Sequence, residues 1–146
     1  MNYLLDASAI LPLVTRRGKQ LIREASREAL ITTDLAIYEA CNSLWKLATL
    51  LKSISFDDAV DVAITLKDLT ARNLIQTIDF TKLDLRDTFN KAYQEQLTFY
   101  DASYITTATT TDAILVTEDE KLRNVANKFV KTATYIDLES RISARR

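Results

Sequence analysis

Short apolar runs alternate along this chain with longer segments of helical periodicity, and this alternation constrains the fold more than any other feature. The apolar runs predict five strands: Asn2–Leu5, Leu30–Thr32, Leu74–Ile78, Ala113–Thr117 and Thr132–Ile136. Strands that alternate with helices are typical of parallel sheets, because a parallel pair needs a long crossover connection. The sequence therefore predicts an α/β fold with a central parallel five-stranded sheet.

We expect one domain, residues 1–146, because Gly18 and Pro12 are the only residues of their types and leave no linker. No apolar run approaches the ~20 residues that cross a bilayer. No basic segment precedes an apolar run at the N-terminus, as it does in a secretory signal. Cys41 is the only cysteine, so no intrachain disulfide can form, which fits a reducing cytoplasm. We therefore predict a cytoplasmic protein without a membrane partner.

Residues 37–51 have helical periodicity, with one apolar and one polar face. The apolar stripe, which we predict to lie in the core, consists of Ile37, Cys41, Leu44, Trp45 and Ala48. The polar face combines Glu39, Asn42, Ser43 and Lys46. Glu39 is therefore expected to border the core near the start of a helix.

The segment after Asp101 is rich in threonine, and β-branched residues disfavour a helix on propensity alone. Ala102, Ile105 and Ala108 nevertheless form an apolar face with helical spacing. We predict a helix whose stability comes from tertiary packing.

Four acids lie at the edges of apolar elements: Asp6, Glu39, Asp101 and Asp119. Asp6 follows the first predicted strand, and ligands bind at the carboxyl ends of parallel strands. An acid beside a buried element is costly unless its charge is compensated. One divalent cation would compensate all four acids.

Each acid also has an ordinary interpretation as part of a helix. Asp6 is a favoured N-cap residue, Asp101 and Asp119 suit the first turn of a helix, and Glu39 suits a helix surface. Thr117 and Glu120 match a capping box with Thr117 as the N-cap, and Asp34 is a predicted N-cap as well.

The chain contains no histidine, and this excludes His-based triads, His general bases and His-ligated zinc. A single cysteine also excludes zinc sites built from several thiolates. Any chemistry must use carboxylates, hydroxyls, amides, Lys or Arg, and hard oxygen ligands suit Mg²⁺ or Mn²⁺. The formal net charge of −1 gives no general argument for nucleic-acid binding, so any basic surface must be local.

Three polar residues are placed to support the acids. Ser8 and Thr117 carry hydroxyls two residues from Asp6 and Asp119 respectively, and Asn42 lies one helical turn after Glu39. Such groups orient metal ligands or a water molecule through hydrogen bonds. Helix capping explains the hydroxyls equally, and ordinary helix-surface polarity explains Asn42 as well.

Taken together, these motifs resemble the PIN domain, in particular the VapC-type toxin ribonucleases. The resemblance covers nearly the whole chain and rests on Leu5–Ala9, Glu39–Asn42, Tyr100–Tyr104 and Leu115–Leu122. The four acids of the family correspond to Asp6, Glu39, Asp101 and Asp119. The family's two hydroxyls correspond to Ser8 and Thr117, and its amide to Asn42.

The resemblance implies a three-layer α/β/α fold with strand order 3-2-1-4-5. It also implies a homodimer, a Mg²⁺- or Mn²⁺-dependent endoribonuclease acting on single-stranded or looped RNA, and a VapB-like antitoxin that blocks the acidic site. The general base is either hydroxide on the metal or one of the acids.

Two other hypotheses remain at this stage. A phosphoacceptor receiver domain also has an acid after its first strand, an Asp after its third (Asp79) and a Thr after its fourth (Thr117). Against it, Asp6 has no adjacent second acid, and no Lys follows the fifth predicted strand. The other alternative is a non-toxin or catalytically silent PIN-domain protein in RNA processing.

Overall fold

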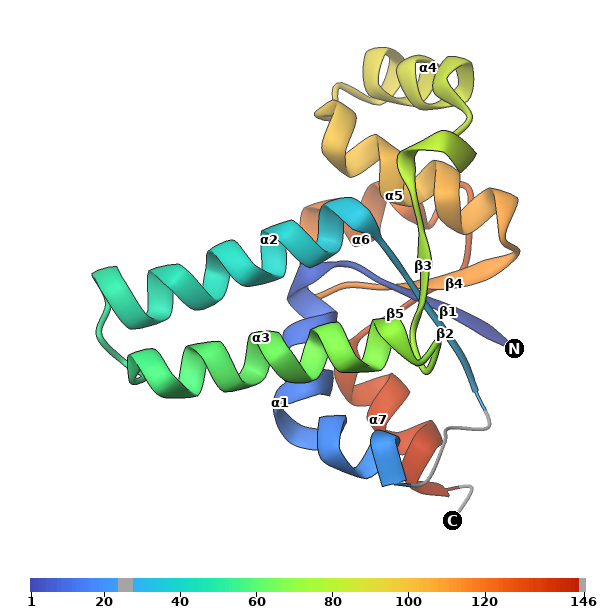
Figure 1. The fold of residues 1–146 in the computed structure, drawn as a ribbon. Helices are drawn as coiled ribbons and strands as arrows, with labels where there is room; N and C mark the ends of the chain where they lie inside the picture. Colours follow the sequence, from blue (N-terminus) through green and yellow to red (C-terminus); the bar gives the residue numbers. More distant parts are fainter. Residues whose placement is uncertain (24–27, 145–146) are drawn as a thin grey trace.

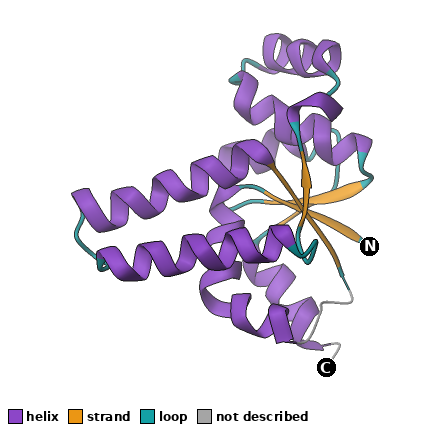
Figure 2. Cartoon of the chain, in the orientation of Figure 1, coloured by secondary structure: helices purple, strands orange, loops and turns teal. Residues whose placement is uncertain are grey.

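A five-stranded, all-parallel sheet forms the centre of the computed structural model, which describes residues 1–23 and 28–144 (Figures 1 and 2). The strands are β1 (Asn2–Leu5), β2 (Ala29–Thr33), β3 (Gln76–Ile78), β4 (Ala113–Val116) and β5 (Thr132–Ala133). Their order is β3-β2-β1-β4-β5, which confirms the expected order 3-2-1-4-5. Every neighbouring pair is parallel.

Helical segments connect the strands. They are α1 (Ala7–Arg23), α2 (Asp34–Trp45), the π-helix η1 (Lys46–Leu50), α3 (Phe56–Ala71), the 3₁₀-helix η2 (Phe80–Lys82), α4 (Leu85–Glu95), α5 (Phe99–Thr110), α6 (Glu120–Ala126) and α7 (Tyr135–Ala144). None of the helices in the described residues is long and apolar enough to span a membrane.

Side chains of β1 alternate between two hydrophobic cores, one on each face of the sheet. Tyr3 and Leu5 join the core formed with α1, α3 and α7. Leu4 points to the opposite face and joins the core formed with α5 and α6. Because a strand buried on both faces needs helices on both sides, this confirms the three-layer α/β/α architecture.

The Thr-rich segment forms helix α5, as predicted. Its N-cap is Thr98, whose side chain accepts a hydrogen bond from the backbone N–H of Asp101, and all seven residues from Ala102 to Ala108 are buried. Burial on nearly every side explains how packing overcomes the weak helix propensity of threonine.

Trp45 is not a core residue, because 49% of its surface is exposed. Helices α2, η1 and α3 form an arm that extends sideways from the sheet (Figure 1), so the distal part of the predicted apolar stripe has no sheet to cover. The fifth strand is also shorter than predicted, since it ends at Ala133 and α7 begins at Tyr135.

Two predicted helix caps are wrong. Asp119, not Thr117, caps α6 by accepting a hydrogen bond from the backbone of Leu122. Thr33, not Asp34, caps α2.

The sheet order excludes the receiver-domain hypothesis. A receiver has the flavodoxin-like order 2-1-3-4-5, in which strand three lies beside strand one. Here β3 is an edge strand paired with β2, so Asp79 follows a strand that lies two positions away from β1 and Asp6.

Candidate active site

Asp6 leaves the carboxyl end of the central strand and is 95% buried. Its carboxylate accepts hydrogen bonds from the hydroxyls of Ser8 (2.6 Å) and Thr117 (2.5 Å) and from the backbone N–H of Ala9 (3.1 Å). Burial raises the pKa of Asp6, and these hydrogen bonds oppose the rise because they favour the charged form. The carboxylate is therefore held in place by a fixed set of donors.

Ser8 and Thr117 connect the ends of β1 and β4. The Thr117 hydroxyl accepts a hydrogen bond from the backbone N–H of Asp119 (3.1 Å), and the Ser8 hydroxyl accepts one from Glu118 (2.9 Å). Each hydroxyl thus donates to Asp6 and accepts from the loop after β4. The orientation of Asp6 is coupled in this way to the position of Asp119.

Asp101 lies in the first turn of α5 and lines the same cleft as Asp6. Burial raises the pKa of its carboxyl, and the negative charges of Asp119 and Glu39 raise it further, while Lys121 opposes them. Two acids from other elements therefore repel the Asp101 carboxylate. A cation between them would relieve that repulsion.

Glu39 is oriented by Tyr104, a residue that the sequence analysis did not single out. The Tyr104 hydroxyl donates a hydrogen bond to Glu39 Oε1 at 2.5 Å, and only 3% of the tyrosine is exposed. Burial is the main cause that raises the pKa of Tyr104, and the hydrogen bond to Glu39 raises it further. The hydroxyl therefore stays protonated and acts as a donor. In the sequence, Tyr104 lies one helical turn after Asp101, and this spacing could have identified it as a neighbour of the site.

Asp119 has two roles in the structure. Its Oδ1 accepts the backbone N–H of Leu122 (3.1 Å) and caps α6, while the residue also lines the cleft. Arg123, one turn further along α6, donates to the carbonyl oxygen of Thr117 (2.8 Å). The loop after β4 is therefore fixed from both ends.

These side chains surround one open cleft of about 650 Å³. Six of the seven site residues predicted from the sequence line it: Asp6, Ser8, Glu39, Asn42, Asp101 and Asp119. Thr117, the seventh, is fully buried behind Asp6. Ser43 and Lys46 line the cleft as well, which confirms that the polar face of residues 37–51 points in one direction.

Within residues 1–23 and 28–144, no group of three or more acidic or Cys side chains is arranged to hold a metal ion. The donor set nevertheless suits Mg²⁺ or Mn²⁺, because it consists of carboxylate oxygens around an open cleft. Burial is the main cause of the raised pKa of Asp101, and the further rise caused by Asp119 and Glu39 indicates negative charge that a cation would compensate. The chemistry of the residues fits a divalent cation.

Comparison with known proteins gives a consistent result. A model of the PIN domain family matches residues 3–128. Exonuclease VapC9 of Pyrobaculum aerophilum is 34% identical over 141 residues, which cover 96% of this chain and 92% of that protein. Ribonuclease VapC3 of the same organism is 33% identical over 139 residues, covering 92% and 99% respectively.

Solved structures show the same fold. The crystal structure of PAE2754 from Pyrobaculum aerophilum superposes with a TM-score of 0.74 at 29% identity, covering 99% of this chain and 90% of that one. VapBC-1 from nontypeable Haemophilus influenzae gives a TM-score of 0.58 at 14% identity, with coverages of 93% and 99%. At that identity the second comparison supports the fold alone.

Proposed function

This chain belongs to the PIN domain family, and from this premise we propose that it is a Mg²⁺- or Mn²⁺-dependent endoribonuclease that hydrolyses RNA phosphodiester bonds. The observation that carries the proposal is the meeting of Asp6, Glu39, Asp101 and Asp119 at one cleft. These acids come from four different elements that are far apart in sequence. Two similar proteins named exonuclease and ribonuclease support the same class of reaction.

In this proposal Asp6, Asp101 and Asp119 hold the cation, and Glu39 contacts it directly or through water. When bound, the cation supplies a Lewis acid that polarises the phosphodiester and acidifies a water molecule. The protein fixes the geometry: Ser8 and Thr117 hold Asp6, and Tyr104 holds Glu39. With no histidine in the chain, a carboxylate of the cleft would accept the proton of the attacking water.

Two further groups in the cleft suit an RNA backbone. Lys46 lines the cleft and offers a positive charge to a phosphate oxygen. Asn42 also lines it, and its amide would support a ligating carboxylate or a water. The proposed substrate is single-stranded or looped RNA.

We propose further that this nuclease is the toxin of a type II toxin–antitoxin pair. It would act in the cytoplasm as a homodimer, and a VapB-like antitoxin would inhibit it by covering the acidic cleft. The two relatives at 34% and 33% identity carry the name VapC, which supports the toxin role, and structures named VapBC share the fold. Co-expression with the product of a small upstream reading frame should abolish both RNA cleavage and growth inhibition; unchanged toxicity would contradict this role.

The test of nuclease activity is incubation of labelled RNA with Mn²⁺, with and without EDTA. We expect cleavage that EDTA abolishes, and circular RNA should be cut as well, because an endonuclease needs no free end. If only linear RNA is cut, the protein is an exonuclease and the endonuclease proposal is contradicted. Absence of cleavage with Mn²⁺ and Mg²⁺ across mixed single-stranded substrates would favour the catalytically silent alternative.

Substitutions of Asp119 can separate the role of its negative charge in cleavage from its role as a helix cap. Asp119→Asn should retain the cap, because Asn is as good an N-cap as Asp, and should lose cleavage. Asp119→Ala should lose cleavage and about 1 kcal/mol of stability as well. Asp84 caps α4 in the same way and does not line the cleft, so Asp84→Asn is the matched control with full activity.

A further inference from the structure

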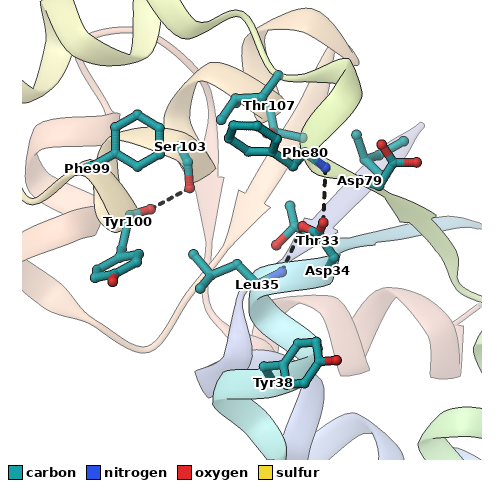
Figure 3. Close-up of a pocket in the computed structure, with 12 residues that line it drawn as sticks. Thr33, Asp34, Leu35, Tyr38, Asp79, Phe80, Phe99, Tyr100, Ser103 and Thr107 are labelled. Atoms are coloured by element: carbon teal, nitrogen blue, oxygen red, sulfur yellow. Dashed lines mark hydrogen bonds between the residues drawn. The ribbon is translucent and has the colours of Figure 1, made fainter.

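An apolar pocket of about 380 Å³ lies beside the acidic cleft. Three segments form it: the start of α2, the end of β3 with η2, and the start of α5 (Figure 3). The pocket shares Leu35, Tyr38 and Tyr100 with the acidic cleft. The two sites are therefore continuous, with these three side chains between them.

Aromatic rings dominate the pocket. Tyr38, Phe80 and Tyr100 are 78%, 58% and 60% exposed, and Phe99 is fixed by a tilted ring contact with Phe89 at 5.0 Å between centroids. Such a concentration of exposed rings marks a binding surface. Exposed aromatic faces are what proteins use to stack the bases of single-stranded RNA.

Carboxylates stand at the border of this apolar surface. Asp34 accepts the backbone N–H groups of Leu35 (2.9 Å) and Phe80 (3.0 Å), which ties η2 to the start of α2. Hydrogen bonds from Thr81 lower the pKa of Asp79, so this carboxyl stays ionised. Carboxylate oxygens have further lone pairs and accept from the N–H groups on the edge of a base.

The pocket, at about 380 Å³, has room for one flat nucleobase, with one face on the rings and one edge toward the carboxylates.

We propose that this pocket holds one unpaired nucleobase of an RNA strand whose neighbouring phosphodiester lies in the acidic cleft. The inference rests on the proposed nuclease function and adds a subsite for recognition. Phe80 supplies a stacking face that belongs to the pocket alone, because it does not line the cleft. Its backbone N–H, not its ring, makes the contact with Asp34, so ring substitutions leave that contact in place.

The first test measures binding without cleavage. Fluorescently labelled single-stranded RNA of about ten nucleotides is titrated with protein in EDTA, and anisotropy is recorded. Phe80→Ala should weaken binding roughly 5- to 150-fold, as expected for the loss of one stacked base. Phe80→Trp should restore it. Phe56, 76% exposed at the start of α3, provides the control Phe56→Ala, which should bind like wild type.

The second test places an abasic nucleotide at each position flanking the cleavage site. At one of these positions, the missing base should reduce the kcat/KM of the wild type by a factor similar to the loss of binding in Phe80→Ala. The same abasic substrate should cause no further loss of kcat/KM in the Phe80→Ala variant. Equal abasic effects in both proteins would overturn the proposal. So would unchanged RNA binding by Phe80→Ala combined with loss of antitoxin binding, because the pocket would then hold a protein side chain.

The two proposals fail separately. RNA binding that depends on Phe80, without metal-dependent cleavage, would support the base pocket and contradict the nuclease function. If neither the Phe80→Ala substitution nor any abasic position changes the rate of cleavage, the nuclease proposal is supported and the base-pocket proposal is contradicted. Absence of both binding and cleavage would overturn both.

Discussion

Thr117→Val tests whether a buried hydroxyl holds Asp6 in place. The substitution keeps the shape of a fully buried side chain but removes the hydrogen bond to Asp6 Oδ2 and the acceptor of the Asp119 N–H. A hydrogen bond to a charged group contributes about 1.5–3 kcal/mol, and an orphaned donor costs about 1 kcal/mol more. We expect the free energy of unfolding to fall by about 2.5–4 kcal/mol.

The measurement is urea unfolding of the metal-free protein followed by circular dichroism. For a chain of this size, the loss corresponds to a decrease in Tm of roughly 8–15 °C. Thr106 provides a matched control, because it is also fully buried and its hydroxyl has no partner in the described part of the chain. Thr106→Val should be neutral or stabilising, since it removes an unsatisfied polar group.

A double-mutant cycle with Asp6→Asn identifies the partner of the hydroxyl. Replacing the carboxylate by an amide turns a charged hydrogen bond into a neutral one, which contributes about 0.5–1.5 kcal/mol. Thr117→Val should therefore cost about 1–1.5 kcal/mol less in the Asp6→Asn background. Equal costs in both backgrounds, within about 0.5 kcal/mol, would refute the idea that Thr117 serves Asp6.

Three further predictions concern the same cleft. Tyr104→Phe should leave the fold intact but weaken Mn²⁺ binding several-fold, measured by isothermal titration calorimetry, because Glu39 loses its donor. Burial raises the pKa of Asp6, and burial with neighbouring acids raises that of Asp101; such groups stabilise the fold at low pH and lose that contribution as pH rises through their folded pKa values. The unfolding free energy of the metal-free wild type, relative to Asp101→Asn, should therefore fall as pH rises above about 4, the ordinary pKa of an aspartate, and a flat difference would contradict the raised pKa. Ser8→Ala should cost only about 0.5–1 kcal/mol in the same assay, because this exposed hydroxyl can be replaced by water.

The strands β1 and β4 and the acids that follow them were predictable because they depend on local patterns. Apolar runs fall on β1 and β4 to within a residue, and parallel strands bring their carboxyl ends to one edge. Asp6 and Asp119 follow such ends, so their proximity required only the sheet order. That order came from the family resemblance, not from periodicity.

Other features depended on tertiary context that periodicity does not contain. Trp45 belongs to an apolar stripe, yet α2 extends past the sheet, and the stripe there has no sheet to cover. Tyr104 resembles an ordinary buried aromatic residue until the fold brings its hydroxyl to Glu39, 65 residues away in sequence. The apolar pocket joins three separate segments, and no local pattern marks it.

Helix capping and metal binding, which compete as explanations in the sequence, act together in the structure. Asp6 and Asp119 each accept a backbone N–H at the start of a helix, and Asp101 lies in the first turn of α5. Three helix N-termini therefore face the cleft, and their dipoles stabilise negative charge before any cation arrives. This explains how the chain folds with four acids around one cleft. It also means that helix dipoles offset part of the repulsion. Burial and then the charges of Asp119 and Glu39 still raise the pKa of Asp101, so part of the repulsion is left to attract a cation.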